Sequence, residues 1–162
     1  MRRSPLHENE RRRLLAAIEI AGRARANGNH PFGALLADAD GSVVLEAENT
    51  VVTDSDTTGH AETNLVRLAS RSLSPQRLAG ATLFTSTEPC AMCSGAIYWS
   101  GIRRVVHALG EEELRELARA GGNTALLALP SRQVFAAGSP VVEVSGPHLF
   151  EQAAAVHGGF WD

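Results

Sequence analysis

The chain has 162 residues, enough for one domain with a buried core, and 44% of them are apolar while 20% are charged. The formal net charge of −3 gives no electrostatic reason to expect a nucleic acid or a membrane as partner. No stretch approaches the roughly 20 apolar residues that cross a bilayer, and residues 1–13 lack the apolar centre of a signal peptide. Two cysteines supply no disulfide framework. We therefore expect a cytoplasmic protein with a single domain, residues 1–162.

Apolar periodicity and turn residues predict helices and strands that alternate along the chain. Helices are expected at residues 8–27, 59–72, 91–100, 111–120 and 147–156. Strands are expected at residues 33–38, 42–49, 81–85, 103–108 and 141–144. Asp40-Gly41 predicts a hairpin between the first two strands, whereas the helices that follow the third and fourth strands favour parallel pairing there. The pattern predicts an α/β fold, a three-layer α/β/α sandwich with a five-stranded mixed sheet.

Two short motifs stand at the starts of predicted helices. His60-Ala61-Glu62 begins one helix, and Pro89-Cys90-Ala91-Met92-Cys93 leads into another. One imidazole and two thiolates are ligands that zinc prefers, and the chain has no further cysteine to close such a site. A catalytic zinc site keeps one coordination position for water, and the partial positive charge of helix N-termini lowers the pKa of thiols. The two motifs together predict a water-activating zinc site.

Glu62 lies two residues beyond His60, where its carboxylate approaches a zinc-bound water without binding the metal itself. Zinc lowers the pKa of bound water towards about 7, and Glu62 would pass the proton first to a ring nitrogen and then to a departing amine. The implied reaction is attack of hydroxide on an amino-bearing amidine carbon with loss of ammonia. We therefore expect a hydrolytic deaminase of a small heterocyclic base.

Each motif alone has a simpler interpretation. A His-Ala-Glu triplet arises by chance in most proteins, and Cys-x-x-Cys between a strand and a helix also fits a thioredoxin-like redox pair. A zinc or redox module without catalysis is the alternative hypothesis, and Glu62 discriminates against it because such a module has no use for that carboxylate. The presence of both motifs on matching helix starts favours the catalytic site.

The paired motifs resemble those of the cytidine deaminase superfamily, the zinc deaminases. Further segments match this family in order and spacing, and they are Pro31-Phe32-Gly33-Ala34, Asn49, residues 56–62 and residues 85–99. The likeness covers about residues 10 to 110 and implies a cytidine-deaminase-like fold with a Zn²⁺ cofactor. Within the superfamily, Gly95-Ala96-Ile97-Tyr98-Trp99 is similar to bacterial guanine deaminases. The tRNA adenosine deaminases usually carry a Met-Ile-His-Ser type sequence there.

The resemblance also implies roles for individual residues. The zinc ligands would be His60, Cys90 and Cys93, with Glu62 as the proton shuttle. The substrate would meet the side-chain amide of Asn49 and the backbone N–H of Ala61, with Phe32 near the pocket. Glu88 would support the cysteine turn rather than react, and His30 is expected to be an exposed turn residue.

Guanine deaminases of this type are similar in forming homodimers, with the C-terminal segment covering an active site. Phe160 and Trp161, in the tail of residues 157–162, are placed to do that here. The simpler interpretation of this tail is a frayed end or an ordered aromatic pair. Trp99 is expected either in the core or in the wall of the pocket.

One departure leaves the substrate open. Those guanine deaminases carry an aspartate after the fourth strand that reads the guanine amino edge, whereas this chain has Gly121-Gly122-Asn123 there. Asn123 is a candidate substrate contact that could donate or accept a hydrogen bond, but it cannot replace a carboxylate that faces two donors. Glu143 and Asp162 are candidate substitutes. We expect guanine or a related aminopurine first, with cytosine, a nucleoside or a triazine as the alternative. A tRNA adenosine deaminase ranks third, because the net charge is near neutral and Tyr98-Trp99 departs from that group.

Overall fold

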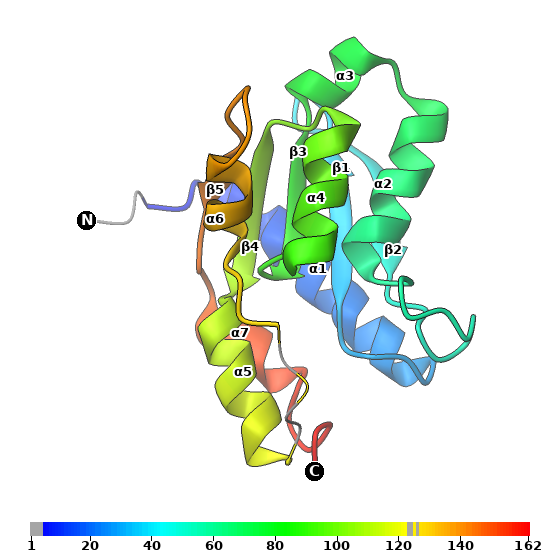
Figure 1. Cartoon of the computed structure of the whole chain (residues 1–162), viewed down its shortest axis with the longest axis vertical. Coiled ribbons are helices and arrows are strands. Elements are labelled where there is room, and N and C mark those ends of the chain that lie inside the picture. Colours follow the sequence, from blue (N-terminus) through cyan, green and yellow to red (C-terminus); the bar gives the residue numbers. More distant parts are fainter. Residues whose placement is uncertain (1–4, 123–124, 126) are drawn as a thin grey trace.

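Five strands in the described part of the chain form one mixed sheet, which is the middle layer of the molecule (Figure 1). The computed structural model describes residues 5–122, 125 and 127–162. The strands are β1 (Gly33–Ala37), β2 (Val43–Glu48), β3 (Thr82–Thr87), β4 (Arg104–Leu109) and β5 (Glu143–Ser145). They lie in the order β2-β1-β3-β4-β5, in which β1 pairs antiparallel with β2 and β3 while β4 pairs parallel with β3 and β5. The predicted mixed sheet and both predicted parallel pairings are confirmed.

Helices cover both faces of this sheet. They are α1 (Glu8–Ala26), α2 (Ala61–Ser72), α3 (Pro75–Gly80), α4 (Ala91–Ser100), α5 (Glu111–Ala120), α6 (Ser131–Ala136) and α7 (Phe150–Ala155). Figure 1 shows α2 and α4 side by side on one face, with α1 on the other face. The predicted three-layer α/β/α sandwich is therefore confirmed. No helix in the described residues combines the length and the apolar character of a membrane span.

Two apolar clusters, one on each face, hold the layers together. Successive residues of a strand point to opposite faces, so Leu36 packs under α2 and α4 while its neighbour Leu35 packs under α1. Leu83 and Phe84 of β3 divide between the same two clusters. The central strands are thus buried on both sides, which explains why their sequences are continuous apolar runs.

The structure adds two short helices that the sequence pattern did not predict. Pro75 prevents α2 from continuing, and it is the first residue of α3. Its missing N–H removes no hydrogen bond there, because the first N–H groups of a helix have no partner within the helix. Ser74 caps this helix, because its hydroxyl oxygen accepts the backbone N–H of Arg77 at 3.3 Å. α6 lies in a stretch for which no element was expected.

The topology brings several segment ends to one edge of the sheet. β3 ends at Thr87 and the parallel β4 ends at Leu109, so both finish at the same edge. β1 is antiparallel to β3, so it begins at this edge, and β2 ends there. The cysteine motif follows β3 directly, which places it at the carboxyl edge where ligands commonly bind in open α/β sheets.

Gly33, the first residue of β1, allows the strand to touch helix α1. A Cβ atom at this position would lie 2.4 Å from the backbone nitrogen of Ala21 and 2.6 Å from the carbonyl oxygen of Ala17. The backbone N–H of Gly33 also donates to the Ser86 hydroxyl at 3.0 Å. The absence of a side chain here sets the distance between two layers of the molecule.

We predict that Gly33→Ala lowers the free energy of unfolding by about 3 kcal/mol, because backbone atoms of α1 would have to move away from the strand. Urea-induced unfolding of both proteins measures the difference. Gly80→Ala is the matched control, since its Cβ atom would make an ordinary 3.6 Å contact with Ala39. Equal stabilities of Gly33→Ala and the wild type would contradict this account of the close approach.

Candidate active site

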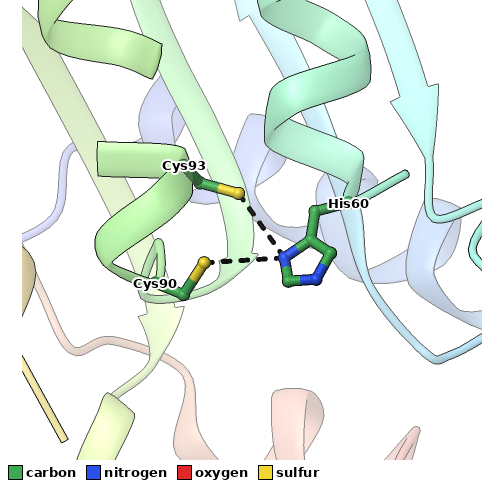
Figure 2. Close-up of side chains that lie close together, drawn as sticks. All are labelled: His60, Cys90 and Cys93. Atoms are coloured by element: carbon green, nitrogen blue, oxygen red, sulfur yellow. Dashed lines mark hydrogen bonds between the residues drawn. The ribbon is translucent and has the colours of Figure 1, made fainter. Parts of the chain in front are cut away.

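The three predicted zinc ligands converge at the carboxyl edge of the sheet. His60 is the N-cap residue of α2, Cys90 is the N-cap residue of α4, and Cys93 lies in the first turn of α4. Figure 2 shows their side chains pointing toward one another from these two helix starts. The His60 Nδ1 atom lies 3.5 Å from Cys90 Sγ and 3.6 Å from Cys93 Sγ. The structure thus joins the two sequence motifs into one group.

The spacing of these atoms fits a zinc ion. In a tetrahedral site with Zn–N bonds of about 2.1 Å and Zn–S bonds of about 2.3 Å, nitrogen and sulfur ligands are about 3.6 Å apart. Both nitrogen–sulfur distances in the group have this value within 0.1 Å. Among the described residues, no fourth histidine, cysteine or acidic side chain joins the group. The donor set therefore matches a catalytic site, which leaves one coordination position for water.

The two cysteines differ in their electrostatic environments. A hydrogen bond with Cys93, together with one from His60, lowers the pKa of Cys90 to about 4 against the effect of burial. The same hydrogen bond and burial raise the pKa of Cys93 well above its usual value. The Cys93 sulfur also lies 3.2 Å from the Thr63 hydroxyl. Without metal the pair therefore shares one proton, which a divalent cation would displace.

Glu62 is buried next to this group, with 5% of its surface exposed, and it is not one of the three ligands. Its Oε1 atom accepts a hydrogen bond of 2.5 Å from the hydroxyl of the fully buried Thr85. Burial raises the pKa of Glu62 above its usual value. A carboxylate with a raised pKa is suited to accept a proton and return it near neutral pH.

Thr85 contacts the expected proton shuttle, and the sequence analysis assigned it no role. It lies on β3 two residues after Leu83, so the alternation of strand side chains directs it to the same face, towards α2. The sequence feature that could have indicated Thr85 is a polar residue in an apolar strand just before the cysteine motif. That feature does not reveal the partner, because Glu62 comes from another element.

Glu88 makes the contacts that its expected supporting role requires. Its Oε1 atom accepts the backbone N–H and the hydroxyl of Ser131 at 2.9 and 2.7 Å, and its Oε2 atom accepts the Glu111 N–H at 2.9 Å. Burial opposes ionisation, but these hydrogen bonds lower the pKa of Glu88 below its usual value. One carboxylate therefore fastens the cysteine turn to the starts of α5 and α6.

The expected base-contacting residues lie at the same edge of the sheet. Asn49 is buried, and its side-chain Oδ1 atom accepts the backbone N–H of Val51 at 3.1 Å. The backbone N–H of Asn49 donates to the Phe32 carbonyl oxygen at 3.1 Å. Ala61 follows His60 as the first residue of α2, where a backbone N–H has no partner within the helix. Asn49, Ala61 and Phe32 are thus gathered around the start of α2, and their contact with substrate stays a prediction.

The C-terminal aromatic residues pack beside the start of β1, at the same edge of the sheet as the metal group. The ring centroid of Phe160 lies 5.6 Å from that of His30, and the Trp161 centroid lies 6.1 Å from His30 and 6.4 Å from Phe32. Burial, followed by the charge of His60, lowers the pKa of His30. The expectation that His30 is an exposed turn residue is therefore wrong, because the tail covers it. Nothing in the local sequence of His30 signals this long-range contact.

Glu143 does not lie at the site, so its expected role as a substrate contact is wrong. It begins the parallel strand β5, and parallel strands begin at the edge opposite to the one where the cysteine motif lies. Its largely exposed carboxylate pairs with Arg104 at 3.2 Å, at the start of β4. Asp162 is exposed at the chain end, and Asn123 lies outside the described residues.

Trp99 lies on the outer surface of α4, with 84% of its surface exposed and its ring edge-on to Tyr98. The expectation that Trp99 lies in the core is wrong, because the helical repeat directs Ile97 rather than Trp99 towards the sheet. A side chain this exposed forms no pocket wall within a single chain.

Comparisons with known proteins agree with this geometry. Residues 7–109 match the model of the cytidine and deoxycytidylate deaminase zinc-binding region. The chain is 43% identical over 162 residues to a probable cytosine deaminase of Schizosaccharomyces pombe, which covers 100% of this chain and 98% of that protein. It is 37% identical over 99 residues to a tRNA-specific adenosine deaminase of Haemophilus influenzae, or 61% of this chain and 57% of that protein.

Among solved structures, the guanine deaminase from Bacillus subtilis is similar with a TM-score of 0.61 and 36% sequence identity, and the match covers 65% of this chain and 68% of that chain. The matched family region contains both motifs and all three convergent ligands. The chain therefore belongs to the cytidine and deoxycytidylate deaminase family and has a zinc-binding domain, in which His60, Cys90 and Cys93 are the candidate ligands.

Proposed function

We propose that this deaminase acts on a small free base, with cytosine as its first substrate and water as the second. The observation that carries the reaction is the buried Glu62 carboxylate beside a three-ligand metal group with one open position. Cytosine is favoured because the similarity to the probable cytosine deaminase runs through the whole chain, including the C-terminal segment. The lack of an aspartate at Gly121-Gly122-Asn123 removes the group expected to read guanine.

Guanine or a related aminopurine is the second candidate. The sequence Gly95-Ala96-Ile97-Tyr98-Trp99 and the likeness to the Bacillus subtilis guanine deaminase support it. A tRNA substrate is disfavoured by the net charge of −3, since binding to a phosphate backbone relies on positive charge. The similarity to the tRNA-specific adenosine deaminase also stops short of the tail.

The residues of the chain divide the work of deamination between them. Bound zinc would lower the pKa of a coordinated water to about 7. Thr85 holds the Glu62 carboxylate by a hydrogen bond to Oε1, and this carboxylate would take the proton of the attacking water and return it to the ring nitrogen. The second proton leaves with the amine, so that cytosine and water give uracil and ammonia. Asn49 and the Ala61 N–H would orient the base for this transfer.

The tail forms one wall of the base site in this proposal. Trp161 and Phe32 lie at a centroid distance of 6.4 Å, and both are near His30, whose pKa responds to the charge of His60. An aromatic wall suits a flat heterocycle, because it offers a large apolar face and excludes water. We propose that this wall is formed by the tail of the same chain, whose aromatic residues lie beside His30 and Phe32.

We predict that Glu62→Gln retains zinc but lowers kcat/KM by about 10³-fold, because the variant keeps the shape of the side chain and loses proton transfer. Ammonia release from cytosine, guanine, adenosine and a triazine measures the wild-type preference, and metal analysis of both proteins checks zinc. Glu112→Gln is the control, since Glu112 is an exposed carboxylate of α5. Full activity in Glu62→Gln would refute the proposed shuttle, and rates that favour guanine over cytosine would reverse the substrate order.

We also propose that the protein is a homodimer through the outer face of α4. This helix contains no charged residue, and its outward stripe consists of Met92, Gly95 and Trp99. A Cβ atom at Gly95 would meet nothing within 4 Å, so the stripe combines a large exposed side chain with an open position one turn away. Such a pair is self-complementary across a two-fold axis, where each Trp99 would cover the partner's open position.

We predict that the wild type sediments as a dimer and that Trp99→Arg sediments as a monomer, because a charge in place of the large exposed side chain of the stripe would be buried without a partner. Analytical ultracentrifugation of the zinc-loaded protein measures both. Val141→Arg serves as the control, since Val141 is exposed and lies outside α4. A monomeric wild type, or a dimer unaffected by Trp99→Arg, would rule out this interface.

A further inference from the structure

Arg25, in the last turn of α1, grips the C-terminal tail. Its Nη1 atom donates to the carbonyl oxygens of Val156 and Gly158, at 2.9 and 2.8 Å. Its guanidinium also lies over the ring of Phe160, 5.5 Å from the centroid. One cation therefore fixes the backbone on both sides of His157 and the first aromatic residue beyond it. Hydrogen bonds from a charged donor are about twice as strong as those between neutral groups.

His157, which lies between the two carbonyl groups that Arg25 binds, contacts Trp161 directly. It is buried, with 3% of its surface exposed, and its Nδ1 atom accepts the Trp161 indole N–H at 3.2 Å. The two rings are stacked with an interplanar angle of 12°, and the His157 ring meets Phe32 edge-on at 5.4 Å. Burial lowers the pKa of His157 to about 4, so the imidazole is neutral and remains an acceptor for the indole at neutral pH.

Gly121, which follows α5, lies in close contact with Trp161. A Cβ atom at Gly121 would lie 1.8 Å from the Trp161 carbonyl oxygen and 2.6 Å from the Trp161 Cβ atom. The φ angle of Gly121 is −85°, which any residue adopts, so contact with the tail is what excludes a side chain there. The end of α5 and the end of α1 therefore bracket the tail.

Apolar packing of the tail on α5 is incomplete. A cavity of about 160 Å³ separates them, and its lining includes Leu117, Ala120, Ala154, His157 and Trp161. Gly158 and Gly159 are exposed, and Gly159 has a φ of +68°, so the turn itself contributes little burial. The hydrogen bonds of Arg25 therefore hold the tail in addition to its aromatic contacts with His30 and Phe32.

We propose that Arg25 is a positioning residue for the base site: it latches the tail onto its own chain and, through His157, holds Trp161 beside Phe32. This inference rests on the proposed role of the tail as a wall of the site. Arg25 itself touches neither substrate nor metal ligands in this scheme. Loss of the latch weakens substrate binding more than it slows the chemical step, because Glu62 and the zinc ligands stay in place.

Hydrogen–deuterium exchange of the zinc-loaded protein tests the latch without any substrate. In Arg25→Ala and Gly121→Ala, amides of residues 156–162 should exchange about ten-fold faster than in the wild type, with Arg25→Lys in between. Arg23→Ala is the matched control, because Arg23 lies in the same helical turn but pairs with Glu46 and Glu48. Unchanged exchange of the tail in both Arg25→Ala and Gly121→Ala would overturn the proposal.

Steady-state kinetics on the preferred base test the positioning role. Arg25→Ala should raise KM by about ten-fold and change kcat by less than about three-fold, with partial recovery in Arg25→Lys. Faster exchange of the tail with an unchanged KM would overturn the positioning role. If no base is deaminated, the exchange data still decide whether Arg25 holds the tail, so failure of the substrate proposal is not mistaken for failure of the latch.

Discussion

The meeting of two helix starts at the end of β3 is the constraint on which the rest of the site depends. The first turns of α2 and α4 leave backbone N–H groups without intrahelical partners, and their partial positive charge favours thiolates and carboxylates there. His60, Cys90 and Cys93 project from these turns into one point, so a single cation can bind all three. Glu88 secures the arrangement from behind, because it joins the cysteine turn to α5 and α6. The metal site is therefore set by backbone geometry more than by flexible side chains.

The same geometry explains why a carboxylate can be buried beside the site. An isolated buried carboxylate destabilises a fold unless hydrogen bonds or a cation compensate it. Thr85 donates to Glu62 from the neighbouring strand, and the metal group adjoins it at the start of the same helix. The raised pKa that results from burial is a cost for stability and an advantage for proton transfer. The cost of burying Glu62 is thus consistent with its proposed role in proton transfer.

The sequence was sufficient for the parts of the structure that repeat or that sit on helix starts. Long periodic segments such as α1 and α5 were predicted within one residue of their ends, and the two motifs predicted that His60, Cys90 and Cys93 come together. The six-residue helices α3 and α6 are too short for an apolar repeat to appear. Contacts between distant segments were invisible, including those of Thr85 and His30. Glu143 was misplaced because the strand was predicted at residues 141–144, which put Glu143 near its end, whereas β5 begins at Glu143.

The family region ends at residue 109, whereas the tail that packs beside His30 and Phe32 lies beyond it. The residues proposed to perform the reaction and the tail proposed to enclose the base are therefore separate along the chain. A tail held by one arginine, one histidine and a glycine contact can change its side chains without disturbing the metal group. The outer stripe of α4 is remote from these contacts in sequence, so the proposed dimer contact and the proposed enclosure of the base rest on different residues. In the proposed function, the type of reaction depends on the two helix starts, whereas binding of the base depends on Asn49, Ala61 and the tail with its supports.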